Sequence, residues 1–369
     1  MAAAVALLAT SQALADITIG VSISLTGPTS ALGIPTRNGI ELWPKSIAGE
    51  KLNVIVLDDA TDPTLGVKNA RRFITEDKFD VIVGSVATPI AAAMSDVATE
   101  GQTVQLMLSP VNLPEGKEAW SFRMPQSTAV MAIPIIDQWK KLGVKTFGFL
   151  GYGEAWLKDI VPVAEKAGIK MVATERFARA DTSVTGQALK LVATNPDAIL
   201  VVASGSGAAM PHKGLVERGY AKGKIYQTHG AASFDLIRVG GADVEGSYVV
   251  SRPAVVAPKL PDSNASKVLG VKYVTEYEKA YGKGMANQFG AHAFDVVIVL
   301  EKAIPLAVKK ARPGTKEFRA ALKDALETMG RTPVSQGVLN FTATDHFGYT
   351  PETGVMLKIV GGEWQVVPH

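Results

Sequence analysis

The feature that most constrains the fold is an alternation of short apolar strands and amphipathic helices, which runs along the chain in two series. In the first series, the pattern predicts strands over residues 17–25, 52–57, 80–83 and 104–108, with helices over 35–47, 63–76 and 89–100 between them. Strands that alternate with helices across short loops form a parallel sheet. The first series therefore predicts an α/β unit whose strands run in one direction.

The alternation pauses at residues 110–126, which contain three prolines, and then begins again. The second series predicts strands over residues 145–150, 169–174, 198–203, 224–227 and 246–250. Three helical stretches without strands of their own follow at 265–281, 288–310 and 315–329, and short strands return within 332–341 and 355–367. The helices without strands need an existing sheet to cover, so the chain must return to one.

The predicted architecture is two doubly wound, Rossmann-like α/β lobes joined by three crossovers, near residues 120, 250 and 331. The chain of 369 residues is long enough for two such domains. We expect residues 16–121 and 251–330 to form the first lobe and residues 122–250 and 331–369 to form the second. Several crossovers between two lobes make a hinge.

The first fifteen residues have the features of a secretory signal peptide. Residues 2–9 are wholly apolar, and Ala13-Leu14-Ala15 precedes Asp16 with the small residues that signal peptidase requires. We expect cleavage before Asp16 and a periplasmic mature chain.

Composition and motifs exclude several classes of function. The 38 basic and 35 acidic residues are spread along the chain, which argues against nucleic acid as a partner. The chain has no cysteine, its five histidines fall in no zinc-binding spacing, and it has neither a Walker phosphate loop nor a G-x-S-x-G elbow. We interpret the adjacent acids Asp58 and Asp59 as turn residues. We therefore expect no catalytic residue, metal or cofactor.

Small and polar residues follow six of the predicted strands, where helices could begin. They occupy residues 26–30, 84–88, 109–112, 151–153, 204–207 and 229–232. Such strand ends can aim backbone N–H groups and hydroxyls at an anion. On two facing lobes they describe a ligand-binding cleft. Tyr152 lies between two glycines at a strand end, so its ring is predicted to contact the ligand, whereas Trp156 and Phe289 suit the core equally well.

The order and spacing of several segments resemble a known family. The chain is similar to periplasmic solute-binding proteins of the branched-chain amino-acid type, which serve ATP-driven (ABC) importers and have the type I periplasmic binding protein fold. The resemblance extends from Asp16 to the C-terminus and is carried by IGVSISLTGPTSALG, VIVGSVATPIAAAMSDVATEG, LSPVNLPE, FRMPQS, GFLGYGEAW and FGAHAFDVVIVLEKAI.

The resemblance implies which residues touch the ligand. It implies that the lobes close over a small solute and that the closed form meets a membrane permease, with the protein acting as a monomer. The first lobe would hold a ligand carboxylate through Ala87, Thr88, Ser109, Val111 and Asn112. The segment from Ser30 to Leu32 would cover the ligand side chain, and Tyr152 would lie against it from the second lobe.

One departure from the family pattern bears on the ligand. Amino-acid binders of this family place an acid in the loop after the strand that matches residues 224–227, and here His229 stands in its place. A buried ammonium without a carboxylate costs several kcal/mol, so an ordinary amino acid is disfavoured. The sequence instead favours an aromatic acid of the benzoate or hydroxycinnamate type, flanked by Tyr152 and Phe289, with His229 or His292 facing a hydroxyl or a second anion.

Three alternatives stay open at this point. Glu154 or another acid could pair with the ammonium of a branched-chain or other amino acid. The same two lobes could form a ligand sensor that contacts a regulator, or an enzyme with an unrecognised catalytic group.

Overall fold

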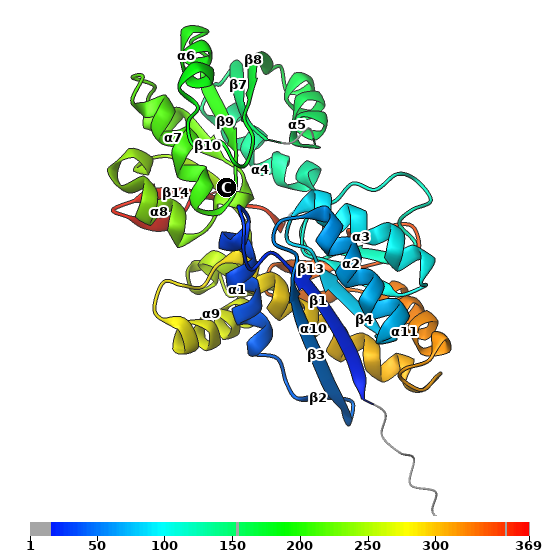
Figure 1. Ribbon diagram of the computed structural model, residues 1–369. Helices are drawn as coiled ribbons and strands as arrows, with labels where there is room; N and C mark the ends of the chain where they lie inside the picture. Colours follow the sequence, from blue (N-terminus) through cyan, green and yellow to red (C-terminus); the bar gives the residue numbers. More distant parts are fainter. Residues whose placement is uncertain (1–15, 153–154, 351–352, 369) are drawn as a thin grey trace, which may run out of the picture.

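The protein consists of two α/β lobes, each built around its own sheet (Figure 1). The structure is a computed structural model that describes residues 16–152, 155–350 and 353–368. The predicted signal peptide, residues 1–15, lies outside the described residues. The two sheets with their helices confirm the α/β class and the two lobes that the sequence pattern predicted.

The sheet of the first lobe has the strand order β2-β3-β1-β4-β5-β6. Its strands are parallel except β2, which pairs antiparallel with β3. In the central strand, Ile17, Ile19, Val21 and Ile23 on one face and Ser22 on the other are all fully buried, as a strand covered on both faces requires. The strand bounds are β1 (Ile17–Ile23), β2 (Ser46–Ile47), β3 (Glu50–Asp58), β4 (Val81–Gly84), β5 (Val104–Met107) and β6 (Ser121–Arg123).

The sheet of the second lobe repeats this arrangement. Its order is β15-β14-β11-β10-β9-β7-β8, so in both lobes the first strand of the series lies between the second and third long strands. The five strands β7 to β11 are parallel, and β14 and β15 extend the sheet antiparallel. The bounds are β7 (Thr146–Gly151), β8 (Lys170–Arg176), β9 (Ala198–Val202), β10 (Ile225–Gln227), β11 (Tyr248–Ser251), β14 (Val355–Val360) and β15 (Glu363–Val366).

Helices cover both sheets. Around the first sheet lie α1 (Ser30–Glu41), α2 (Pro63–Arg71) with its π-helical continuation η1 (Arg72–Glu76), α3 (Thr88–Glu100), α9 (Lys267–Tyr281), α10 (Gln288–Ala307) and α11 (Lys316–Thr328). Around the second lie α4 (Thr128–Lys141), α5 (Ala155–Lys166), α6 (Thr185–Ala193), α7 (Ala209–Val216), α8 (Phe234–Gly240) and the short 3₁₀ helices η2 (Gly205–Ala208), η3 (Lys222–Lys224), η4 (His229–Ala231) and η5 (Gly241–Val244). None of the described helices combines the length and the apolar character needed to cross a bilayer.

The first helix differs from its prediction over residues 35–47. It begins five residues earlier, at Ser30, and ends at Glu41, and Ile47 belongs to β2. Leu32, Thr36 and Ile40 are buried four residues apart, on the face that packs against α10. Tertiary packing of this face thus accommodates Pro35 inside the helix, where the sequence had suggested a start.

The chain crosses between the lobes three times. The first crossing lies between β6 and α4, and the second follows β11, where η6 (Pro253–Lys259) leads to α9. The third was predicted near residue 331, but residues 332–349 pack with the first lobe: the hairpin β12 (Thr332–Val334) and β13 (Gly337–Leu339) buries Val334 and Leu339 against the core that α10 and α11 share. The third crossing therefore lies between Tyr349 and Val355.

Candidate ligand-binding site

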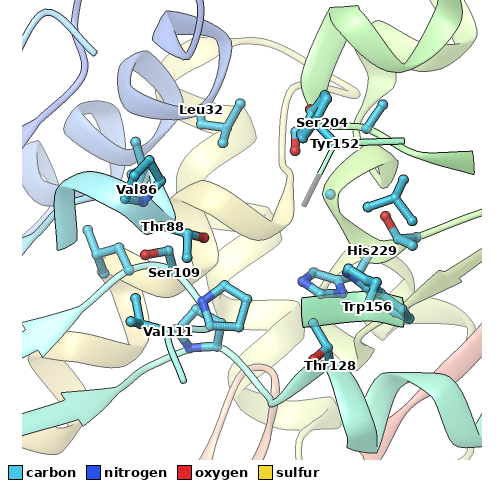
Figure 2. A pocket seen from close by; sticks show the side chains of 18 of the residues that line it. Leu32, Val86, Thr88, Ser109, Val111, Thr128, Tyr152, Trp156, Ser204 and His229 are labelled. Atoms are coloured by element: carbon cyan, nitrogen blue, oxygen red, sulfur yellow. The ribbon is translucent and has the colours of Figure 1, made fainter. Parts of the chain in front are cut away.

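A cavity of about 530 Å³ lies between the lobes. Figure 2 shows its two walls, with Thr88 and Ser109 of the first lobe facing Tyr152 and His229 of the second. The lining comprises Leu32, Val86, Thr88, Pro89, Ala92, Leu108, Ser109, Pro110, Val111, Asn112, Pro125, Thr128, Tyr152, Trp156, Lys158, Arg179, Val202, Ala203, Ser204, Thr228, His229, Gly230, Phe289 and His292. A cavity of this size and position, at the carboxyl ends of parallel strands, is typical of a small-molecule site.

The first-lobe wall is small, neutral and polar. Thr88 begins α3, which has no side-chain cap; Pro89 has no N–H, and the Ile90 N–H donates to the Ala87 carbonyl at 3.1 Å, so the N–H and hydroxyl of Thr88 are the donors that this helix start offers beside the cavity. Ser109 follows β5 and donates its hydroxyl to the Ser85 carbonyl at 3.2 Å. These groups can accommodate an anion without a lysine or arginine from this wall.

A buried acid holds the loops behind this wall. Asp59 accepts hydrogen bonds of 2.6 Å from the hydroxyls of Ser24 and Ser85, which joins the ends of β1 and β4. Its neighbour Asp58 accepts from the backbone N–H groups of Leu25 and Ala60, both at 2.8 Å. These hydrogen bonds confirm that the acid pair belongs to the turn. Burial also raises the pKa of Asp59.

The second-lobe wall is aromatic and cationic. The guanidinium of Arg179 lies 3.9 Å from the centre of the Tyr152 ring, whose edge packs on Phe177 at 5.3 Å. The ring centres of Trp156 and His229 are 5.6 Å apart. Figure 2 places Trp156 beside His229, and Tyr152 near Ser204 on the same wall. The wall can thus present ring surfaces and positive charge to a ligand.

The inner end of the cavity is formed by α10. Asn287 caps this helix by accepting hydrogen bonds from the N–H groups of Phe289 and Gly290, which fixes Phe289 and His292 on the turn that faces the cavity. Burial holds the pKa of His292 and of His229 well below the usual value, and the positive charge of Arg252 adds to both shifts. Both imidazoles are therefore neutral at physiological pH.

The described lining contains no aspartate or glutamate, whereas Lys158 and Arg179 contribute cations. The acid nearest to the wall in sequence, Asp159, accepts a hydrogen bond from Thr128, and burial raises its pKa. Glu154, named above as a possible partner for an ammonium, lies outside the described residues. Within the described chain no group of three or more histidine, aspartate and glutamate side chains could hold a metal ion.

The structure brings together most of the predicted site residues. Eight of the ten line the cavity, namely Leu32, Thr88, Ser109, Val111, Asn112, Tyr152, His229 and Phe289. Ser30 and Ala87 do not, because Ser30 lies two residues before the cavity-facing Leu32 on α1 and thus on another side of the helix, and Ala87 is buried as the residue before α3. The roles of all ten in binding stay predictions.

Sequence reasoning missed several lining residues. Trp156 was compatible with the core, and only its place beside His229 assigns it to the wall. Arg179 lies in a polar loop after β8, with no local signal that separates it from an ordinary surface arginine. Ser204 was predicted only as part of the strand end at residues 204–207 and not as a site residue of its own.

Comparison with known proteins agrees with this geometry. The periplasmic binding protein family matches residues 16–358, and the chain belongs to that family. The structure of an extracellular ligand-binding receptor from Rhodopseudomonas palustris HaA2 is 46% identical, with a TM-score of 0.94 over 96% of this chain and 100% of that chain. The Leu/Ile/Val-binding protein homolog 3 of Brucella melitensis is 25% identical and covers 90% of this chain and 89% of its own length.

A third similarity concerns fold alone. A solute-binding protein of an ABC transporter from Rhodopseudomonas palustris, in complex with benzoate, is 16% identical with a TM-score of 0.78 over 96% of each chain. Together, fold and family define an extracytoplasmic solute-binding protein. Such proteins bind a small molecule and work with a membrane permease.

Proposed function

We propose that this protein captures a small aromatic acid of the benzoate or hydroxycinnamate type, without an α-ammonium group, and delivers it as a monomer to an ABC permease. The observation that carries the proposal is the charge of the cavity. Its described lining has cations and no carboxylate, and His229 stands where amino-acid binders of the family place an acid. Such a lining attracts an anion and leaves an ammonium without a partner.

The aromatic rings that line the cavity support the aromatic part of the proposal. Tyr152, Trp156 and Phe289 reach the cavity from three separate elements, so a flat ligand can be contacted from several sides. Aromatic pairs add about 0.5–1.5 kcal/mol each beyond the area they bury. The benzoate complex of the distant Rhodopseudomonas protein is consistent with this ligand class, since that protein has the same fold.

Closure of the lobes would retain the ligand. Contacts between the lobes already exist at two points: Gln288 of α10 donates to the His229 carbonyl, and η2 packs on α1. A Cβ added at Gly205 would lie 3.0 Å from the Ala31 Cβ, so the glycine allows close approach there. Binding favours the closed form by as much as the ligand prefers it.

A branched-chain amino acid is the second candidate. It is favoured by the Leu/Ile/Val-binding names of curated relatives, which match at 25–26% identity over about 90% of this chain. On this alternative, an acid that the described lining does not contain would pair with the ammonium.

Thermal-shift and calorimetric titrations separate the two candidates. We expect benzoate, 4-hydroxybenzoate, cinnamate or 4-hydroxycinnamate to raise the melting temperature, and leucine, isoleucine and valine to leave it unchanged. Stabilisation by leucine or valine with none by the aromatic acids would end the proposal. Size-exclusion chromatography with light scattering tests the monomer.

A further inference from the structure

Arg252 is a fully buried cation whose partners are all neutral. It follows β11 at the second crossing and is 0% exposed. Its Nη1 donates to Gln288 Oε1 at 3.2 Å and to Gln336 Oε1 at 3.4 Å, and it contacts His292 Nε2. Its Nε and Nη2 are buried without any hydrogen-bond partner. Desolvation lowers the pKa of Arg252 only to about 10, so the guanidinium is charged at neutral pH.

The charge of Asp295 acts on Arg252, but the two side chains form no ion pair. Among the described residues, Arg252 forms no ion pair with a carboxylate. Asp295 is engaged instead with the backbone N–H groups of Ser335 at 2.7 Å and Gln336 at 3.2 Å, and burial raises the pKa of Asp295 to about 7. The Tyr349 phenol is neutral, because burial holds its pKa well above the usual value. A buried charge without a partner is strongly unfavourable, which points to a counter-ion that arrives from outside the chain.

His292 connects this charge to the cavity. It touches Arg252 on one side and lines the cavity on the other. Because a guanidinium can only donate, Nε2 of His292 accepts, and its proton is assigned to Nδ1, which has no partner. His229, also on the wall, has a buried Nδ1 without a partner. The inner end therefore combines a cation with two imidazoles whose Nδ1 atoms have no hydrogen-bond partner.

We propose, on the basis of the function proposed above, that Arg252 is a specificity-determining residue that acts through His292 and supplies the counter-charge for the carboxylate of the ligand. The guanidinium lies behind the wall, separated from the cavity by one imidazole, where it does not contact the ligand. It favours an acid over the uncharged amide of the same shape. A neutral side chain could cross-link Gln288 and Gln336 equally well, but it would not make this distinction.

The test compares an acid with its amide in matched variants. Benzoate and benzamide, and 4-hydroxycinnamate and its primary amide, are titrated into the wild type, Arg252→Met, Arg252→Gln and Arg252→Lys. The Met and Gln variants should bind the acids about 30-fold more weakly, the effect of one charge about 8 Å away at an effective dielectric constant of about 20, and the amides less than about threefold more weakly. Arg252→Lys should restore acid binding to within about fivefold of the wild type.

Arg218→Met is the matched control. Arg218 lies at the end of α7, where it donates to the Gly214 carbonyl at 2.7 Å, and it does not line the cavity. Removing its charge should change neither acid nor amide binding. The Gln variant can keep hydrogen bonds with Gln288 and Gln336, which provides a second folded protein if Met disturbs the packing.

The outcomes separate this proposal from the proposed function. If the wild type binds the acids and the Met and Gln variants lose acid and amide equally, or lose neither, Arg252 has only a structural role and the ligand class stands. If the wild type binds none of the aromatic acids, the proposed function itself is wrong. A selective loss of acid binding, recovered by lysine, is the result we expect.

Discussion

The first-lobe wall of the cleft offers hydroxyls and backbone N–H groups, whereas the second-lobe wall offers rings and cations. Thr88 and Ser109 owe their places to two strand ends of one parallel sheet, so their arrangement is a local consequence of the fold. Tyr152 and Trp156 belong to the β7–α5 unit of the other sheet and His229 follows β10, so Trp156 and His229 meet only in the folded lobe. In the function proposed above, the first wall would hold the carboxylate of the ligand, and the second wall would select the group attached to it.

Changing His229 to aspartate should have the largest effect, because it gives the second wall the charge that amino-acid binders have. The introduced carboxylate would repel the acid of the ligand within a buried cavity and could pair with an ammonium. We expect aromatic acids to bind more than ~1,000-fold more weakly, a change of ~4 kcal/mol, and leucine to begin to bind.

Isothermal titration of benzoate and leucine measures this change. His229→Asn is the control of similar size without charge, and it should retain aromatic-acid binding within about tenfold. Unchanged binding of benzoate to the aspartate variant would show that position 229 does not face the ligand charge.

Removing the hydroxyls of the first wall should have the next largest effect. Thr88→Val and Ser109→Ala should each weaken every carboxylate ligand by about 10-fold to 100-fold, since a hydrogen bond to a charged group contributes about 1.5–3 kcal/mol. The same change should apply to ligands with and without a ring. A loss of affinity that differs between ligands with and without a ring would contradict the proposal that the first wall binds only the carboxylate.

Removing the ring of Tyr152 should have a smaller effect, confined to aromatic ligands. Tyr152→Leu keeps apolar volume but loses the ring that packs on Phe177 and under Arg179, so we expect about 3-fold to 10-fold weaker binding. Tyr152→Phe keeps the ring and should bind within about twofold of the wild type. Competition titration with benzoate and cyclohexanecarboxylate checks this selectivity, and an equal loss for both acids would contradict it.

The smallest expected effect concerns Asp295, behind the inner end. Burial raises its pKa from the ordinary value of 3.8 to about 7, so the folded state holds a proton that the unfolded chain releases. The resulting stability is complete below about pH 4 and is lost as the pH rises through 7. Asparagine does not titrate. The melting temperature of Asp295→Asn, relative to that of the wild type, should therefore rise between pH 4.5 and 8.

Scanning calorimetry at several pH values measures this difference. Asp197→Asn serves as a comparison of opposite sign, because hydrogen bonds from residues 145 and 146 lower the pKa of Asp197. A melting-temperature difference between wild type and Asp295→Asn that does not vary with pH would show that Asp295 is ionised in the folded protein, and hence that Arg252 has a counter-ion already.

Local patterns determined much of this protein. The alternation of apolar strands and amphipathic helices specified two parallel α/β units, since hydrophobic periodicity is a property of neighbouring residues. The loops at strand ends identified most of the first wall, because the carboxyl ends of parallel strands always share one edge. The sequence alone showed that His229 stands where the family pattern of amino-acid binders has an acid.

Only the tertiary structure decided the features that depend on packing across long stretches of chain. The hairpin β12–β13 could have covered either sheet, and burial of Val334 and Leu339 beside α10 and α11 assigns it to the first lobe. Arg252 meets His292 although forty residues separate them. Such contacts follow from how whole elements fit together, and no local spacing of residue types encodes them, so the charge behind the cavity became visible only once the chain was folded.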